Sequence, residues 1–384
     1  MLASCSLLHQ ILNSVPRSEF EQLVSKRKSD RGARGFTSRD QFVAMMFCHL
    51  GRAQSLREIE NGLRSAGGKI HQLGIKVPVR STLAYANEHR TWQLYRDMFF
   101  ATLNNCRSVQ KGRHKLRFKN PLRSLDSTTV EVVSEMFDWA KYNKAKGAIK
   151  LHLLLDHDGY LPTYACITDG QKADITVGRM LDFDPGSVIV FDRGYVDYAW
   201  FRSLTERKVW FVTRLKKNAH YEVIEELPAP QGILSDQLVD LMMSQRNDFI
   251  PLRLRRIEIA DPNRDGKSLV FFSNLLHFGA TTIAAIYKER WQIENFFKAI
   301  KQTMKIKTFI GSSMNAIQIQ LWTALIAMLL IRYIKLKSQC PVSLSNLVAM
   351  LRFHLLAHRE LWEWLKEPFA PPDPPQAVQG VLFR

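Results

Sequence analysis

The sequence predicts an α/β protein with a helical region at each end, and three observations support this prediction. Between residues 122 and 215, β-branched and apolar runs alternate with helical patterns. Residues 1–106 carry helical spacing throughout. Residues 280–307 contain no proline or glycine and repeat apolar residues at helical spacing. The 384 residues suffice for two or three domains with a sizeable core.

The composition favours a polyanionic partner in a reducing compartment. The formal net charge is +18 and the pI is about 9.8, which favours nucleic acid ahead of an anionic membrane. The five cysteines form no C-x-x-C pair, which indicates reduced thiols in a cytosolic setting and no zinc ribbon. The expected location is cytoplasmic and nucleoid-associated. No secretion-signal pattern opens the chain. Polar residues break the apolar run Ile317–Ile334, which therefore indicates a buried core helix and not a membrane span.

Residues 1–106 are expected to form a helical N-terminal domain. Short helices separated by turns fit a helix-turn-helix DNA reader or a plain helical bundle, and the sequence alone leaves both open. Residues 107–121 are a basic linker, which is either solvated or follows a phosphate backbone. The predicted helix starts are the capping boxes Ser38 with Gln41 and Ser55 with Glu58, and Arg80, whose helix should run through Arg90 towards Phe100.

Residues 122–215 and 280–312 are expected to form the core of the protein. The apolar run Ser187–Phe191 is typical of a central strand buried on both faces. A three-strand meander followed by helix, strand, helix and strand is the order of a ribonuclease-H-like fold. The predicted elements are strands Ser124–Val133, Ile149–Asp156 and Leu161–Ile167, helix Ala173–Leu181, strand Ser187–Phe191, helix Tyr198–Arg207 and strand Val209–Leu215.

Two further regions complete the chain. Residues 216–279 are predicted to be a mainly β insertion into the core. Residues 313–384 are predicted to be a C-terminal region of two helices and an extended proline-rich tail. The expected elements are strands Arg253–Ile259 and Ser268–Ser273, and helices Asn315–Lys337 and Ser343–Leu365.

The helix expected over Ala280–Lys307 carries two stripes of different character at about 100° per residue. The apolar stripe can dock on a core, and the mixed stripe should then face a cleft. The other interpretation is an amphipathic surface helix with solvated charges, although such a face rarely collects Tyr and Trp. The apolar stripe is Ile286, Ile293, Phe297, Ile300 and Met304; the mixed stripe is Tyr287, Arg290, Trp291, Glu294, Lys298, Lys301 and Lys305.

Two aspartates occupy positions in strands that call for an explanation. Asp126 lies inside the first strand, where a carboxylate is costly unless it is paired or metal-bound. Asp192 closes the central strand, at the end where α/β sheets place their sites. Taken singly, Asp126 would be a strand-edge residue and Asp192 a turn residue. Together with Glu294 they form an oxygen-ligand set, which suits Mg²⁺ or Mn²⁺ and not zinc.

The spacing Tyr287-x2-Arg290-x3-Glu294-x6-Lys301 is the Y-R-E-K signature of a large family of bacterial insertion-sequence transposases of the DDE class. The chain resembles this family from about Leu122 to Lys307. The resemblance implies an enzyme that cuts double-stranded DNA at the ends of its own element and joins the 3′-hydroxyl ends to target DNA. It also implies that the N-terminal domain binds the element ends and that the protein is a homodimer on DNA.

The resemblance assigns metal-binding roles to the three acidic residues. Two Mg²⁺ ions, or Mn²⁺ in their place, would lie about 3.5–4 Å apart and support in-line phosphoryl transfer. Asp126 would bridge both ions, and Asp192 and Glu294 would each hold one.

The resemblance also implies DNA contacts by the helix. Tyr287, Arg290 and Lys301 would contact phosphates near the cleaved end, as Arg and Lys are suited to do. Lys298 belongs to the same set of cations. Trp291 is either a core residue or a stacking surface for a base at the cleaved end.

Two rival functions share parts of this pattern. A DNA-binding protein with a decayed catalytic site would keep the same residues, and nicking activity separates it from a transposase. A glycosidase also uses paired carboxylates, but cations beside Glu294 would depress the pKa that an acid catalyst needs raised. Some relatives form a DNA hairpin with a Trp of the β insertion; residues 216–279 contain no Trp. Asp174 is expected to be a turn or helix-entry residue, and His152 a structural histidine.

Overall fold

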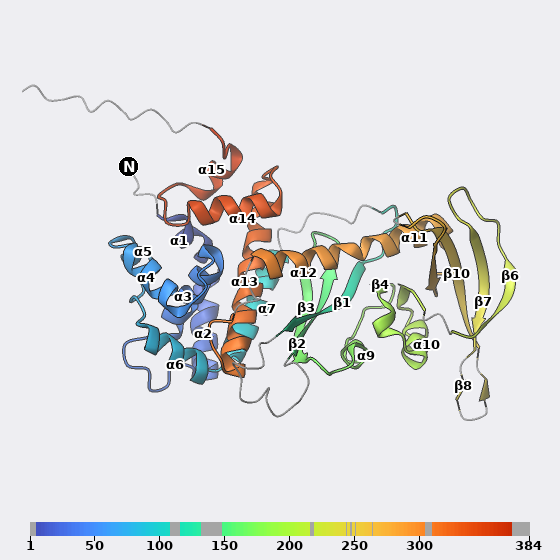
Figure 1. Cartoon of the computed structure of the whole chain (residues 1–384), viewed down its shortest axis with the longest axis horizontal. Coiled ribbons are helices and arrows are strands. Elements are labelled where there is room, and N and C mark those ends of the chain that lie inside the picture. Colours follow the sequence, from blue (N-terminus) through green and yellow to red (C-terminus); the bar gives the residue numbers. More distant parts are fainter. Residues whose placement is uncertain are drawn as a thin grey trace, which may run out of the picture.

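The computed structural model describes residues 5–107, 116–131, 148–215, 219–242, 244–245, 248–249, 251–262, 264–303 and 309–370. It is a mixed α/β protein, as predicted, and it has one large sheet and many helices (Figure 1). A helical body occupies one end, the sheet fills the middle, and the opposite end consists mostly of strands (Figure 1). Predicted features that lie outside the described residues are Val133, most of the basic linker (108–115), Met304, Lys305, Lys307 and nearly all of the proline-rich tail (371–384).

The sheet begins with antiparallel strands and continues with parallel ones. β1 (Leu122–Glu131) pairs antiparallel with β2 (Ala148–Asp156), and β2 pairs antiparallel with β3 (Pro162–Asp169). β4 (Val188–Phe191) runs parallel to β1, and β5 (Trp210–Thr213) runs parallel to β4. Every residue of β4 is buried, because helices or strands cover both faces of this apolar strand.

Two short helices connect these strands. α9 (Asp174–Gly178) precedes β4, and α10 (Tyr198–Glu206) lies between β4 and β5. α9 is shorter than the predicted helix Ala173–Leu181, because its last turn gives way to tight turns before residue 181. α10 is capped by Asp197, whose side chain accepts a hydrogen bond from the backbone N–H of Trp200.

The β-rich segment continues the central sheet. β11 (Ser268–Ser273) pairs antiparallel with β5, with Phe272 opposite Thr213. β10 (Leu252–Ala260), β7 (Ser235–Leu241) and β6 (Tyr221–Glu226) follow as antiparallel neighbours, which gives the strand order β3-β2-β1-β4-β5-β11-β10-β7-β6. Two-residue strands β8 (Ser244–Gln245) and β9 (Asp248–Phe249) form a separate pair. Backbone hydrogen bonds therefore join this segment directly to the core strands.

The expectation of one unbroken helix over residues 280–307 is wrong. The structure has two helices, α11 (Ala280–Glu289) and α12 (Trp291–Thr303), which meet at Arg290. At the junction the N–H of Arg290 bonds to the carbonyl of Tyr287, and the N–H of Ile293 bonds to the carbonyl of Arg290. These bonds span three residues instead of four, so the junction is a tightened turn. No glycine or proline marks it.

Each of the two helices covers a different part of the core. Ile283 and Ile286 of α11 pack with Val190, Val212 and Phe271 of the sheet. The apolar side chains of α12 pack instead with β1, β2, β3 and the helical body. The predicted apolar stripe is buried in both helices, as Ile286, Ile293, Phe297 and Ile300 show.

The helical body combines the two ends of the chain around one buried helix, α13 (Met314–Ser338). Trp322 of α13 packs against Phe99 and Phe100, with ring centroids 5.6 and 6.2 Å apart. α13 is long and apolar enough to cross a membrane, but 89% of its most apolar window is buried inside the protein. The prediction of a core helix is therefore confirmed. The other helices of the body are α1 (Leu7–Leu12), α2 (Arg17–Arg27), α3 (Ser38–Gly51), α4 (Leu56–Ser65), α5 (Lys69–Leu73), α6 (Arg80–His89), α7 (Gln93–Arg107), α14 (Leu344–Phe353) and α15 (Leu361–Lys366).

Tertiary contacts move several predicted helix ends in this body. Ser55 caps α4 as predicted, by accepting a hydrogen bond from the N–H of Glu58. The helix expected to run from Arg80 to Phe100 is instead two helices, because Arg90 adopts an extended conformation. The helix expected over residues 343–365 is also two, because Leu355 and Ala357 between them accept hydrogen bonds from the first turn of α1.

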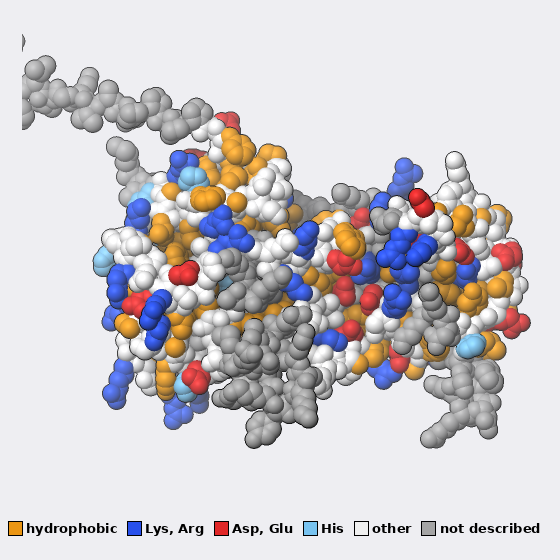
Figure 2. All heavy atoms as spheres, in the orientation of Figure 1, with side chains coloured by type: hydrophobic (Ala, Val, Ile, Leu, Met, Phe, Trp, Pro, Cys, Tyr) orange, Lys and Arg blue, Asp and Glu red, His pale blue; other side chains and the backbone are white. Residues whose placement is uncertain are grey.

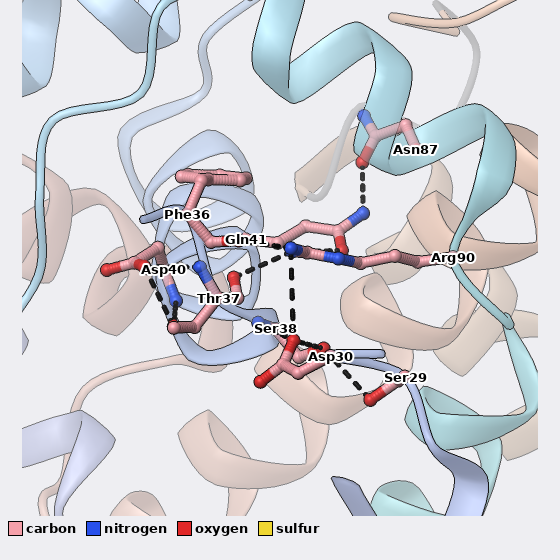
Figure 3. Close-up of polar contacts among 9 residues, drawn as sticks. All are labelled: Ser29, Asp30, Phe36, Thr37, Ser38, Asp40, Gln41, Asn87 and Arg90. Atoms are coloured by element: carbon pink, nitrogen blue, oxygen red, sulfur yellow. Dashed lines mark hydrogen bonds and ion pairs between the residues drawn. The ribbon is translucent and has the colours of Figure 1, made fainter. Parts of the chain in front are cut away.

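A partly buried polar network fixes the loop between α2 and α3 (Figure 3). Arg90 donates hydrogen bonds to the carbonyls of Phe36 and Thr37 and stacks over the Phe36 ring. Asp30 accepts hydrogen bonds from the N–H and the hydroxyl of Ser38, at 2.7 and 2.6 Å. Because Ser38 is engaged in this way, Thr37 and not Ser38 forms the capping box of α3, together with Asp40. The loop is thus held from both sides.

We expect Arg90→Met to lower the free energy of unfolding by about 2–3 kcal/mol, because the carbonyls of Phe36 and Thr37 lose a charged donor. Arg64→Met is the matched control: its ion pair with Glu60 has an arginine side chain that is 64% exposed, so its loss should cost less than about 1 kcal/mol. Urea denaturation of both variants measures the difference. Equal losses would show that the network contributes no more than a surface pair.

Candidate active site

Strand register brings the two aspartates together. β1 and β4 are parallel, with Leu125 opposite Phe191. Asp126 and Asp192 each follow the residues of that pair, so they lie side by side where β4 ends. Asp192 then caps a short 3-10 turn, with its Oδ1 accepting a hydrogen bond of 2.8 Å from the N–H of Gly194.

Arg290 joins the third carboxylate to this pair. Its Nη1 lies 3.3 Å from Asp126 Oδ2, and its Nη2 lies 2.5 Å from Glu294 Oε1. The guanidinium also lies over the ring of Tyr287, 5.5 Å from the centroid. Glu294 sits one turn after Arg290, in the first turn of α12. The tight helix junction therefore places a cation between two acidic side chains.

The electrostatics of the site favour a proton on Asp126 when no other cation is bound. Burial raises the pKa of Asp126 to about 7, and the neighbouring Asp192 contributes to the increase. Arg290 and the hydrogen bond from the N–H of Ser127 act in the opposite direction but do not cancel it. Near neutral pH a metal ion that binds Asp126 therefore competes with a proton for this carboxylate.

Most of the predicted site residues line one cavity. It has a volume of about 520 Å³, and its wall includes the three carboxylates and three cations. Figure 2 shows acidic and basic side chains next to each other over the middle of this face, where α11 and α12 cross the sheet. Lys301 also donates a hydrogen bond of 2.8 Å to the carbonyl of Thr129. The lining residues are Asp126, Ser127, Thr128, Asp192, Arg290, Glu294, Phe297, Lys298, Lys301 and Gln302.

Two predicted residues lie elsewhere. Tyr287 is half-buried and packs its ring against Phe271, with centroids 4.6 Å apart. Trp291 is 59% exposed, so the interpretation of Trp291 as a core residue is wrong. The turn at Arg290 directs Trp291 into a second cavity of about 770 Å³. That cavity is lined by Arg193, Arg214, Asp261, Arg264, Lys267, Ser268, Leu269 and Trp291.

The three carboxylates supply hard oxygen donors of the kind that Mg²⁺ and Mn²⁺ prefer. Within the described ranges, however, no three His, Cys, Asp or Glu side chains are close enough together to form a metal site. Arg290 explains the spacing, because its guanidinium stands between Asp126 and Glu294. The three carboxylates are suitable ligands for a divalent ion. In this structure the guanidinium of Arg290 supplies the positive charge between Asp126 and Glu294.

Sequence reasoning missed several residues around the site. The second cavity combines Arg193, which directly follows Asp192, with cations of the β10–β11 turn. The only signal for it was the position of Arg193, because the pairing of β11 with β5 was not predicted. Asp174, predicted to be a helix-entry residue, accepts a hydrogen bond of 2.8 Å from Ser127 beside the cavity. His152 is structural as predicted: it is buried, and its Nε2 lies 2.8 Å from Thr168 Oγ1.

Comparison with known proteins shows the family to which the chain belongs. A family model described as "Transposase DDE domain" matches residues 117–330, more than half of the chain. A domain family of unknown function matches residues 4–76.

Three bacterial relatives align with most of the chain. "Putative transposase y4zB" of Sinorhizobium fredii is 33% identical over 66% of this chain and 71% of its own length. "Probable transposase for insertion sequence element IS5377" of Geobacillus stearothermophilus is 30% identical over 71% and 72% of the two chains. "Putative transposase for insertion sequence element IS4SA" of Synechocystis is 23% identical over 81% and 88%. The chain belongs to the bacterial insertion-sequence transposases of the DDE class.

Proposed function

We propose that the protein cleaves DNA at the ends of its own insertion sequence and transfers the strands into target DNA, in a reaction that depends on divalent metal ions. One observation carries this proposal. Asp126, Asp192 and Glu294 come from two strands and a helix that are far apart in the sequence, yet they line one cavity together with three cations. A site that pairs acidic groups with a phosphate-binding wall suits phosphoryl transfer.

The strand order supports a ribonuclease-H-like core within this proposal. Three antiparallel strands are followed by two strands parallel to β1, in the order β3-β2-β1-β4-β5. The same core would comprise residues 122–215 and 280–312, with 216–279 as its β-rich insertion. In this arrangement Asp126 lies on β1, and Asp192 directly follows the adjacent strand β4.

Asp126, Asp192 and Glu294 would hold two Mg²⁺ or Mn²⁺ ions. When bound, such ions activate the attacking oxygen and stabilise the leaving oxygen of a phosphoryl transfer. Arg290 must give up its contact with at least one carboxylate for this to happen, and its guanidinium is then available for a DNA phosphate. A planar guanidinium binds a phosphate with two parallel hydrogen bonds.

Lys298 and Lys301 continue the phosphate-binding wall along α12. They follow Arg290 by about two and three turns of helix and line the same cavity. Their ammonium groups act as point charges, so they contribute affinity without reading sequence. The DNA strand to be cleaved would therefore run along α12 past the carboxylates.

The second cavity would hold the neighbouring part of the DNA end. Trp291 presents an exposed ring there, among Arg193, Arg214, Arg264 and Lys267. Stacking of a base on an aromatic ring contributes about 1–3 kcal/mol, which offsets much of the cost of unstacking a terminal nucleotide. Trp291 would thus receive a displaced base within reach of the cleavage site.

The helical N-terminal region would bind the element ends. The loop between α2 and α3 and the exposed face of α6 surround a cavity of about 470 Å³ that is lined by Arg27, Lys28, Arg31 and Arg34. Tyr85 is 65% exposed there and stacks on His89, with centroids 4.0 Å apart. The Arg90 network described above holds this loop in place. Cations on a fixed loop beside an aromatic pair suit a nucleic-acid backbone.

Asp126→Asn, Asp192→Asn and Glu294→Gln should each abolish cleavage and leave binding of the element ends largely intact, since each keeps the size of the side chain and removes its charge. A nicking assay in Mg²⁺ on DNA that carries the element ends measures the first property, and gel shifts without metal measure the second. Glu222→Gln on the exposed edge strand β6 is the matched control and should cleave normally. Normal nicking by Glu294→Gln would show that Glu294 is not a metal ligand. Binding without cleavage by the unaltered chain would indicate a decayed transposase.

Lys298→Ala should weaken binding to all DNA sequences similarly and make the salt dependence shallower. Each phosphate contact contributes about −0.9 to the slope of log affinity against log salt on duplex DNA, so the slope should change by about one contact. Lys288→Ala, an exposed lysine of α11 outside the cavity lining, is the control with an unchanged slope. Identical slopes for both variants would make Lys298 a solvated surface residue.

Trp291→Ala should leave folding and first-strand nicking nearly normal and slow the later step that needs a displaced base. The ring is exposed, so its loss leaves no cavity in the core. An abasic nucleotide at the DNA end should restore the step, because no base then needs a stacking surface. Phe353→Ala, which removes another exposed ring, at the end of α14 and outside both cavities, should behave like the unaltered chain. A uniform slowing of all steps would argue against stacking.

A further inference from the structure

Asp174 is a fourth carboxylate beside the candidate active site, and its hydrogen bonds do not serve its own helix. An acidic residue at a helix start usually accepts hydrogen bonds from the first backbone N–H groups. α9 has no side-chain cap, however. Asp174 Oδ1 instead accepts hydrogen bonds from Ser127 Oγ at 2.8 Å and from Lys150 Nζ at 3.1 Å. Both donors belong to strands β1 and β2 of the core.

Ser127 connects Asp174 to the first aspartate of the site. Its backbone N–H donates a hydrogen bond of 2.8 Å to Asp126 Oδ1, while its hydroxyl donates to Asp174. A single residue therefore holds two carboxylates, one on each side of β1. Without Asp174, the Ser127 hydroxyl loses this hydrogen bond, which helps to fix the position of the residue.

Gly194 connects Asp174 to the second aspartate. The N–H of Gly194 donates a hydrogen bond of 2.8 Å to Asp192 Oδ1. A Cβ atom at Gly194 would lie 2.9 Å from Asp192 Oδ1 and 3.2 Å from Asp174 Oδ2. Both carboxylates therefore lie close to Gly194, and a side chain at this position would force at least one of them to move.

Two basic side chains of β2, Lys150 and His152, lie next to the Asp174 carboxylate. Lys150 provides the positive charge, and it also donates to the carbonyl of Lys172, which fixes its ammonium group. His152 lies nearby, with its Nδ1 3.8 Å from Asp174 Oδ1. Burial lowers the pKa of His152 to about 4, so this histidine is neutral and Lys150 is the counter-ion.

We propose that Asp174 is a positioning residue that orients Asp126 through Ser127 and confines Asp192 through Gly194, so that both carboxylates are arranged for divalent ions before the ions arrive. This inference rests on the proposed function, in which Asp126 and Asp192 hold metal. Partners that orient the ligands of a metal typically change its affinity by about 10–100-fold when they are removed. Asp174 itself is not among the residues that line the cavity.

The test measures Mn²⁺ binding to the full chain without DNA, by calorimetry, and counts only the binding that Asp126→Asn removes. Asp174→Asn should raise the half-saturating Mn²⁺ concentration by about 10–100-fold. Asp169→Asn is the matched control, because Asp169 is an exposed aspartate of the same region whose side chain accepts a hydrogen bond from the N–H of Gln171, away from Ser127 and Gly194. Its Mn²⁺ affinity should not change.

Ser127→Ala provides a second, milder variant, which removes the hydroxyl and keeps the N–H that contacts Asp126. It should weaken Mn²⁺ binding in the same direction. The double variant should bind no more weakly than the worse single variant, because the Ser127 hydroxyl acts through its contact with Asp174, which Asp174→Asn already alters. A folded Asp174→Asn chain with unchanged Mn²⁺ affinity overturns the inference. If Asp174→Asn does not fold, unchanged affinity in Ser127→Ala overturns it. If the unaltered chain shows no Mn²⁺ binding that depends on Asp126, the proposed function fails first and the inference falls with it.

Discussion

The site depends on the guanidinium of Arg290 between Asp126 and Glu294. Three carboxylates close together in a partly buried cavity repel one another, and a buried charge is tolerated only with a partner. Arg290 supplies that partner from the helix junction itself, so the tight turn between α11 and α12 and the electrostatics of the cavity are one feature. The guanidinium packs over the ring of Tyr287, and this ring in turn packs against Phe271 of the sheet. The sheet therefore determines the position of the cation.

This arrangement also explains why Trp291 and Glu294 face different cavities. In a straight helix the two residues would share the stripe that the sequence predicts. The hydrogen bonds that span three residues at Arg290 rotate the start of α12 relative to α11. Glu294 then faces Asp126, while Trp291 faces the β10–β11 turn. The junction separates the cavity that contains the three carboxylates from a more strongly basic one.

Local patterns predicted much of the fold and the acidic part of the site. Asp126 and Asp192 were identified because a carboxylate within or at the end of an apolar strand is unusual, and strand register explains why they meet. Tertiary contacts decided the features that were not predicted. Arg90 ends α6 because its side chain binds carbonyls of a distant loop, and no residue near Arg290 breaks helices. β6 escaped prediction because every one of its residues is exposed, so it shows no alternation of apolar and polar residues.

The burial of α13 has a consequence for synthesis of the protein on the ribosome. The N-terminal helices emerge first. Phe99 and Phe100 can pack against Trp322 only after more than two hundred further residues have been made. The buried contact of 2.9 Å between His49 Nε2 and Thr323 Oγ1 likewise forms only after residue 323 has been made. Until then the nascent N-terminal region exposes apolar surface, which favours chaperone binding or aggregation. A polypeptide truncated before residue 314 would lack the centre of its helical body, even though its first hundred residues were intact.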